Sequence, residues 1–157
     1  VFKQKTAYEI YQCDWSSDVC SSDLLTASFK QELLQGVHDF DADVFKIALY
    51  TSSSDLSSAT TIYTALGETS GTGYTAGGAT LTNLGVTLSG TTAYTSWDSY
   101  TWSNSTLTTA GALVYNASKG NRSVAVLNFG GTYSTSAGPF TVTFPANTST
   151  TAPVIIY

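Results

Sequence analysis

Apolar side chains follow a helical spacing in one segment, residues 28–40. They lie at intervals of four, one and three residues, which places them on one face of a helix: Phe29, Leu33, Leu34 and Val37. Ser28 is followed three residues later by Gln31, the pattern of a capping box. The sequence therefore predicts a helix that begins at Ser28 and reaches Phe40, with Gly36 as its weakest position.

From Val44 onward the period changes to two. Phe45, Ile47 and Leu49 alternate with Lys46, Ala48 and Tyr50, which predicts a half-buried strand. Short strand candidates separated by turn residues then follow to the end of the chain: 62–66, 80–88, 92–97, 99–102, 105–109, 111–116, 122–129, 139–144 and 153–157. The predicted core takes its apolar residues mainly from these segments.

Many short strands at close spacing are typical of an antiparallel sheet protein. Thr and Ser make up 42 of the 133 residues from 25 to 157, and these residues suit solvated sheet faces and turns. We therefore expect a mainly β fold, an antiparallel β-sandwich or barrel-like domain with one N-terminal α-helix. Residues 25–157 are expected to form a single domain.

Residues 1–24 differ from the rest in composition. They hold both cysteines and none of the 13 glycines, and neither a helical nor a two-residue apolar period runs through them. Codons can be chosen for Cys13–Leu24 that resemble the read-primer part of a common short-read sequencing adapter, and for Lys3–Ile10 that resemble its flow-cell end. We therefore expect residues 1–24 to be translated adapter, and the cysteines to form neither a disulfide nor a metal site.

Charge is scarce and its balance is acidic. The formal net charge is -5, which argues against a protein that binds nucleic acid through a basic face. No apolar run approaches the roughly 20 residues of a membrane-spanning helix. With a single His and no Met, the chain offers few groups for metal or nucleophilic chemistry. We expect no enzyme activity and no cofactor.

Two polar motifs near the predicted helix have residue types that can carry chemistry. His38 stands beside Asp39, and we interpret it as a capping interaction at the helix C-terminus rather than half of an acid–base pair. The run Asp39, Asp41, Asp43 has the opening spacing of a calcium loop. It lacks the later Gly and Glu of such a loop, so we expect an acidic, solvated turn there.

Two further segments are candidates for contact with a partner. The glycine-rich stretch 71–78 lacks the Lys-Ser/Thr ending of a phosphate loop, which favours a surface loop that can serve as a contact surface. Its candidate residues are Gly71, Gly73, Tyr74, Gly77 and Gly78. Four closely spaced aromatic residues fit either a sugar-stacking platform or ordinary core packing: Tyr94, Trp97, Tyr100 and Trp102.

Five stretches spread over residues 28–157 resemble, in order, a family of small virion structural proteins of tailed bacteriophages. The segments are Ser28–Gly36, Val44–Ser52, Gly71–Gly78, Gly111–Asn116 and Ala125–Gly131. The resemblance implies a non-enzymatic component of an environmental phage virion, associated with capsid or tail, whose partners are other virion subunits. The alternative is a fibre-type receptor- or carbohydrate-binding module that uses the aromatic surface.

Residues 80–118 contain one charged side chain, Asp98. Sheet edges of monomeric proteins are usually protected by charge or Pro, so an uncharged run of strands is a site of self-association. We therefore expect this run to contribute an interface through a sheet edge or an aromatic face. The chain is then expected to form a homo-oligomer.

Overall fold

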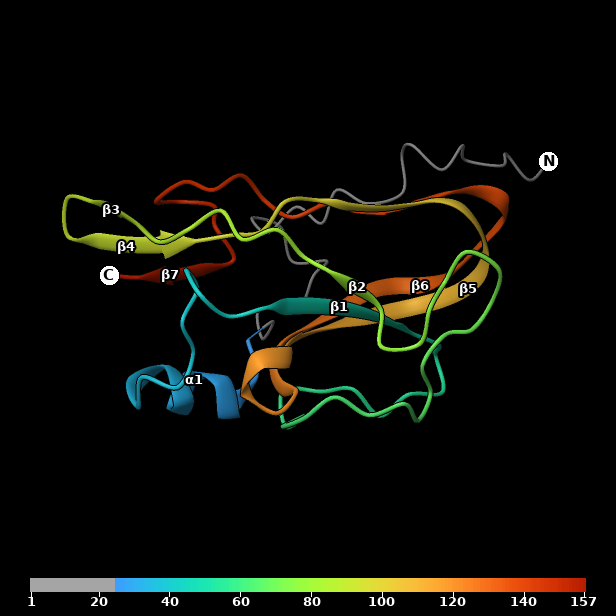
Figure 1. The fold of residues 1–157 in the computed structure, drawn as a ribbon, viewed down its shortest axis with the longest axis horizontal. Helices are drawn as coiled ribbons and strands as arrows, with labels where there is room; N and C mark the ends of the chain where they lie inside the picture. The colour runs from blue at the N-terminus through green and yellow to red at the C-terminus, as the bar shows by residue number, and fades with distance from the viewer. Residues whose placement is uncertain (1–24) are drawn as a thin grey trace.

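The computed structural model describes residues 25–157, so the adapter expectation for residues 1–24 lies outside the described residues. Within the described part, seven strands form two antiparallel sheets, and one α-helix precedes them in the chain (Figure 1). The elements are α1 (Ala27–Leu34), β1 (Phe45–Tyr50), β2 (Ala79–Thr80), β3 (Thr87–Ser89), β4 (Thr92–Thr95), β5 (Tyr100–Asn116), β6 (Arg122–Val142) and β7 (Val154–Ile156). The predicted mainly β, sandwich-like fold with an N-terminal helix is confirmed, and the sheets do not close into a barrel.

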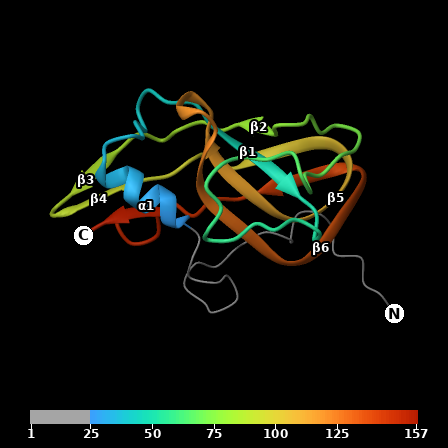
Figure 2. The same cartoon turned by 90° about the horizontal axis from the view of Figure 1, so that it is seen from below.

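The larger sheet has the order β2-β1-β5-β6 and is built on one long hairpin. A short 3-10 helix, η2 (Ala117–Lys119), joins β5 to β6, and Gly120 and Asn121 adopt positive φ angles of 68° and 60° to close the turn. Away from this turn the hairpin bends back over itself, as Figures 1 and 2 both show. The register of the two strands shifts between Thr109 and Gly111, close to the bend.

The smaller sheet has the order β3-β4-β7 and lies at the same end of the molecule as helix α1 and the C-terminus (Figures 1 and 2). Its register places Leu88 opposite Ala93, and Ala93 opposite Ile156. Because side chains directly opposite each other lie on the same face of a sheet, these three residues form one row across the three strands. The row matters for the functional site described below.

The main core lies inside the fold of the hairpin. Its apolar residues come from β1, both halves of β5 and β6, the helix and the segments that lead to β4 and β7. Among the buried side chains are Phe29, Phe45, Ile47, Leu49, Trp97, Trp102, Leu107, Val114, Val124, Phe140, Val142 and Val154. Packing the two halves of one bent hairpin against each other therefore supplies most of the interior.

A second, smaller core lies on the opposite face of β1 and β5. Ala48, Tyr50, Leu113 and Tyr115 are buried there, and Leu56 and Tyr63 of the long loop 51–78 cover them. The prediction that the first strand is half-buried is wrong, because this loop forms a layer over the face that was expected to be solvated.

The helix is shorter than predicted. It begins after Thr26, whose side chain accepts a hydrogen bond from Phe29 N, so the predicted cap at Ser28 is wrong by two residues. It ends at Leu34, and Gly36 adopts a φ of 69° immediately afterwards. Leu34 is 92% exposed, so it does not join the apolar stripe that predicted the longer helix.

Candidate functional site

The aromatic residues proposed as a stacking platform do not share a surface. Trp97 is 2% exposed, and its ring lies 5.4–6.0 Å, centroid to centroid, from three core rings. Trp102 is 6% exposed and packs against Tyr100 and Tyr74. Of the two alternatives for this set, core packing is therefore confirmed for both tryptophans: Trp97 follows β4, Trp102 lies in β5, and both side chains belong to the main core.

The two tyrosines of the same set have separate environments. Tyr100 is half-buried and meets Trp102 edge to face, with ring centroids 4.8 Å apart. Tyr94 lies on β4 in the smaller sheet, among the residues that line a groove beside α1. Tyr94 therefore lines a surface depression.

The glycine-rich segment is pressed against the larger sheet. A Cβ at Gly71 would lie 2.0 Å from Thr106 O, and one at Gly78 would lie 1.9 Å from Ile47 O. Gly73 makes a comparable approach to the backbone of Asn104. These glycines allow the loop to lie along β5 and β1, where Thr106 N donates to Thr72 O at 2.9 Å. The expected surface loop thus lies along the sheet, with Gly71 and Gly73 still exposed.

One carboxylate holds this loop in place. Glu68 accepts hydrogen bonds from the hydroxyl groups of Tyr63 and Tyr74, both at 2.7 Å, and from Gly77 N at 2.7 Å. Burial, together with the adjacent Glu68 carboxylate, raises the pKa of Tyr63 and Tyr74, so both phenols keep the protons that they donate. Tyr115 completes the arrangement by donating to Gly77 O at 2.7 Å.

A buried polar chain runs from the helix to the end of β5. His38 Nε2 lies 2.9 Å from Glu32 Oε2, and Asn116 Nδ2 lies 3.0 Å from His38 Nδ1. These contacts fit the tautomer with hydrogen on Nε2, because the Asn116 amide donates to Nδ1. Arg122 reaches Glu32 Oε1 from the start of β6. The capping role predicted for His38 is wrong, because the helix ends before it and its imidazole is buried against Glu32.

Asp43 belongs to the same chain. Its Oδ2 atom accepts from Asn116 Nδ2 at 2.8 Å and from Asp39 N at 2.9 Å, while Lys119 Nζ lies 3.4 Å from Oδ1. Burial raises the pKa of Asp43, but the hydrogen bonds from Asp39 and Asn116 and the Lys119 charge outweigh it and lower the pKa overall. The prediction that this acidic turn is solvated is wrong for Asp43, which is only 8% exposed.

This arrangement joins the helix, the turn before β1 and the end of β5. The His38 side chain has no exposed surface, and both of its ring nitrogens are engaged. The Asp39 carboxylate accepts from Asp41 N and Ala42 N within its own turn. Within residues 25–157, no three His, Cys, Asp or Glu side chains gather in a way that could hold a metal ion.

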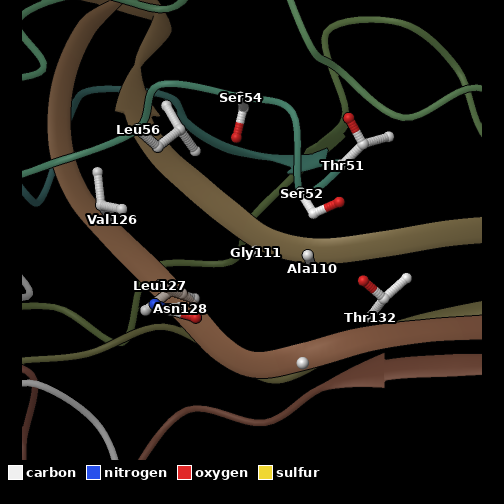
Figure 3. A pocket seen from close by; sticks show the side chains of 11 residues that line it. Thr51, Ser52, Ser54, Leu56, Ala110, Gly111, Val126, Leu127, Asn128 and Thr132 are labelled. Carbon is white, nitrogen blue, oxygen red and sulfur yellow. The ribbon is translucent and has the colours of Figure 1, made fainter.

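A pocket of about 300 Å³ lies beside the bend of the hairpin (Figure 3). The segment 51–56 borders it on one side and β6 on the other, with Ala110 and Gly111 of β5 between them (Figure 3). The lining carries hydroxyl and amide groups and four aliphatic side chains, but no charged side chain: Thr51, Ser52, Ser54, Leu56, Ala110, Gly111, Val126, Leu127, Asn128, Gly131 and Thr132. Such a surface suits a small neutral ligand.

A groove of about 370 Å³ lies between the end of α1 and the smaller sheet. Leu33 borders it from the helix, and Ala93 and Ile156 border it from the sheet. Val86, just before β3, and Asp39 also line it. Beyond the groove the same sheet face continues to Leu88, which is 71% exposed. Sequence reasoning gave Tyr94 as the contact residue of this sheet, whereas the apolar row lies on its neighbours.

The groove and the apolar row next to it are the strongest candidate for a functional surface. Val86 and Ile156 are 53% and 50% exposed, so a large fraction of their apolar surface meets water. The alternation of side chains along a strand could have identified part of this surface, since residues two apart, such as Val86 and Leu88, share a face of an extended segment. The sequence pattern could not show which side of so short a strand the protein body would cover.

No helix among residues 25–157 is long and apolar enough to cross a bilayer. Comparison of the chain with protein-family models, with curated proteins and with solved structures finds no match.

Proposed function

We propose that this chain is a non-enzymatic structural protein of a tailed-bacteriophage virion, associated with the capsid or the tail. The single observation that carries the proposal is the exposed apolar face of the smaller sheet beside its groove. Contiguous apolar surface of this kind is typical of a protein–protein contact. The resemblance of residues 28–157 to phage structural proteins supplies the kind of assembly.

The scarcity of charge supports the same function. Residues 123–157, which contain most of β6 and all of β7, carry no Asp, Glu, Lys, Arg or His. When subunits pack together, each charge that becomes buried in a contact costs free energy unless it is paired. A subunit with a neutral surface avoids this cost. Neighbouring virion subunits are therefore the partners that fit this surface.

Two observations test the proposal. The genes that flank this one in its genome are expected to encode capsid, portal or tail proteins, and peptides of residues 25–157 are expected in purified virions. The decisive measurement is quantitative mass spectrometry of such virions, with a copy number in a fixed ratio to a known structural protein. A chain absent from virions whose other structural proteins are all detected would reject the proposal.

A carbohydrate-binding fibre module is the second candidate, and the pocket of Figure 3 is the observation that favours it. The buried tryptophans cannot supply the stacking surface, so binding would depend on the hydroxyl and amide groups of Ser52, Asn128 and Thr132. Titration with glucose, galactose and N-acetylglucosamine, followed by NMR, tests it. Shifts confined to these residues would support the second candidate, and their absence at about 50 mM sugar, far above the usual range of specific affinities, would remove it.

A further inference from the structure

We propose that the apolar row Leu88–Ala93–Ile156 of the smaller sheet packs against the same row of a second copy of this chain, forming a twofold dimer. The inference rests on the proposed function in one respect, namely that the chain works through protein contacts. It goes further by naming the first partner and the surface involved. It does not depend on which assembly receives the dimer.

The register of the smaller sheet defines the row. Leu88 of β3 pairs with Ala93 of β4, which pairs with Ile156 of β7, so all three side chains lie on one face. The neighbouring row on that face contains Thr95 and Val154, which are 3% and 4% exposed because the body of the protein covers them. The sheet is thus buried at its inner end, while its outer row remains open.

The open row is too apolar for a surface that stays in water. Leu88 is 71% exposed and Ile156 50%, and Val86 at 53% extends the patch on the β3 side. The small Ala93 between the two larger side chains leaves a depression in the middle of the row. A twofold partner can place its own Leu88 or Ile156 over that depression, which is the interdigitation found where two sheets stack.

Charge favours a second copy as the occupant. In a twofold interface the residues close to the axis meet their own copies, so any charge at the centre is opposed by the same charge. The row itself and the whole segment 123–157 contain no charged side chain. The acidic groups near this face lie at its margin: Asp39 lines the groove, and Asp41 Oδ1 accepts from Val86 N at 3.3 Å. An acidic chain can therefore meet its own copy at this face without opposing charges at the centre.

The test is the oligomeric state of the full chain in reducing buffer, which prevents Cys13 and Cys20 from cross-linking copies. Sedimentation equilibrium should show a monomer–dimer equilibrium. Leu88→Lys should raise the dimer Kd by about ten- to a hundredfold, since it removes a Leu from the interface and sets two like charges against each other. Leu66→Lys is the matched control. Leu66 is also strongly exposed, at 78%, but it lies in the loop 51–78, which covers the second core and is not part of the smaller sheet.

A second measurement locates the contact. On dilution, the methyl resonances of Val86, Leu88 and Ile156 should shift, whereas that of Leu66 should not. A monomer at about 1 mM would overturn the inference, because that concentration corresponds to a free energy of association of only about 4 kcal/mol. A dimer that weakens equally in both variants, or that Leu88→Lys leaves unchanged, would also overturn it. Either result leaves the virion proposal to its own test by mass spectrometry.

Discussion

Asn116 and His38 are separated by 78 positions in the chain, yet Asn116 Nδ2 lies 3.0 Å from His38 Nδ1 in the interior. The same amide group donates to Asp43 Oδ2 at 2.8 Å, and Asn116 Oδ1 accepts from Ser118 N and Lys119 N. One fully buried side chain thus connects the segment after the helix, the turn before β1 and the hairpin turn between β5 and β6.

Replacing Asn116 by Ala should lower the free energy of unfolding by about 3 kcal/mol, because the substitution removes partners from a buried carboxylate and a buried imidazole. Urea denaturation at pH 7 measures the change. Asn104→Ala is the control, since Asn104 is exposed on β5, and it should change stability by less than about 0.5 kcal/mol. Equal effects of the two substitutions would contradict a structural role for the polar chain.

The stability of the protein should fall in acid through Asp43. The pKa of Asp43 is lowered in the folded state, whereas an unfolded Asp titrates near 3.9. A lowered pKa contributes stability above the unfolded value, and this contribution is lost as the pH falls toward the folded pKa. Thermal melts at pH 7, 4 and 3 should show the loss below about pH 4.

Asp43→Asn should reduce that part of the pH dependence, even though it also lowers stability at pH 7. The quantity to compare is the difference in melting temperature between the variant and the original chain at each pH. This difference should become smaller between pH 4 and pH 3. A difference that is constant across this range would show that another group governs the acid response.

Gly78 and Gly90 have similar positive φ angles, 69° and 62°, but different surroundings. A Cβ at Gly78 would lie 1.9 Å from Ile47 O, whereas one at Gly90 would meet no atom within 4 Å. Gly90→Ala should therefore cost about 1 kcal/mol, the cost of the backbone conformation alone. Gly78→Ala should cost about 3 kcal/mol or more, since the loop must move away from β1.

Denaturant melts of the two glycine variants separate these contributions. If Gly78→Ala were no more destabilising than Gly90→Ala, the close packing of the loop on β1 would be wrong. Reduced soluble yield of the Gly78 variant alone, with Gly90→Ala expressed normally, would agree with the expected order.

Trp97 should act through packing alone. Trp97→Ala should lower stability by about 3–5 kcal/mol, the usual cost of removing a large aromatic side chain from a core. Trp97→Phe should cost less than about 2 kcal/mol, because it keeps an aromatic ring and removes an indole N–H that has no hydrogen-bond partner in the structure. Calorimetry of both variants checks the order. A sugar-binding defect in Trp97→Phe without loss of stability would contradict this assignment.

The parts of the fold that were predicted from sequence are those governed by local patterns. The alternation around Ile47 identified β1, and the Ser/Thr-rich composition with frequent turn residues indicated an antiparallel sheet protein. What could not be predicted was the covering of β1 on both faces, because Tyr63 reaches it from a loop whose sequence carries no periodic signal. The bend of β5 and β6 was also missed, because bulges near Gly111 made one long strand look like several short ones.

The candidate site was predicted less well, because it depends on contacts between distant segments. The spacing of Trp97 and Trp102 fits a surface platform and a core equally, and only the path of the chain decides between them. The row of Leu88, Ala93 and Ile156 joins residues nearly 70 positions apart, so no single segment carries its signal. The partner of His38 was missed for the same reason.

The bent hairpin has a consequence for the order of folding. Contacts between β5 and β6 begin at the turn Ala117–Lys119 and extend outward from it, so the hairpin can form before distant segments join. β1 pairs with β5 across more than sixty residues, and the loop 51–78 can settle only on a β1–β5 pair that already exists. Substitutions in the hairpin turn, such as Gly120→Ala, should therefore slow refolding in stopped-flow experiments. Substitutions beneath the loop, such as Tyr63→Phe, should mainly speed unfolding, and the reverse pattern would reject this order.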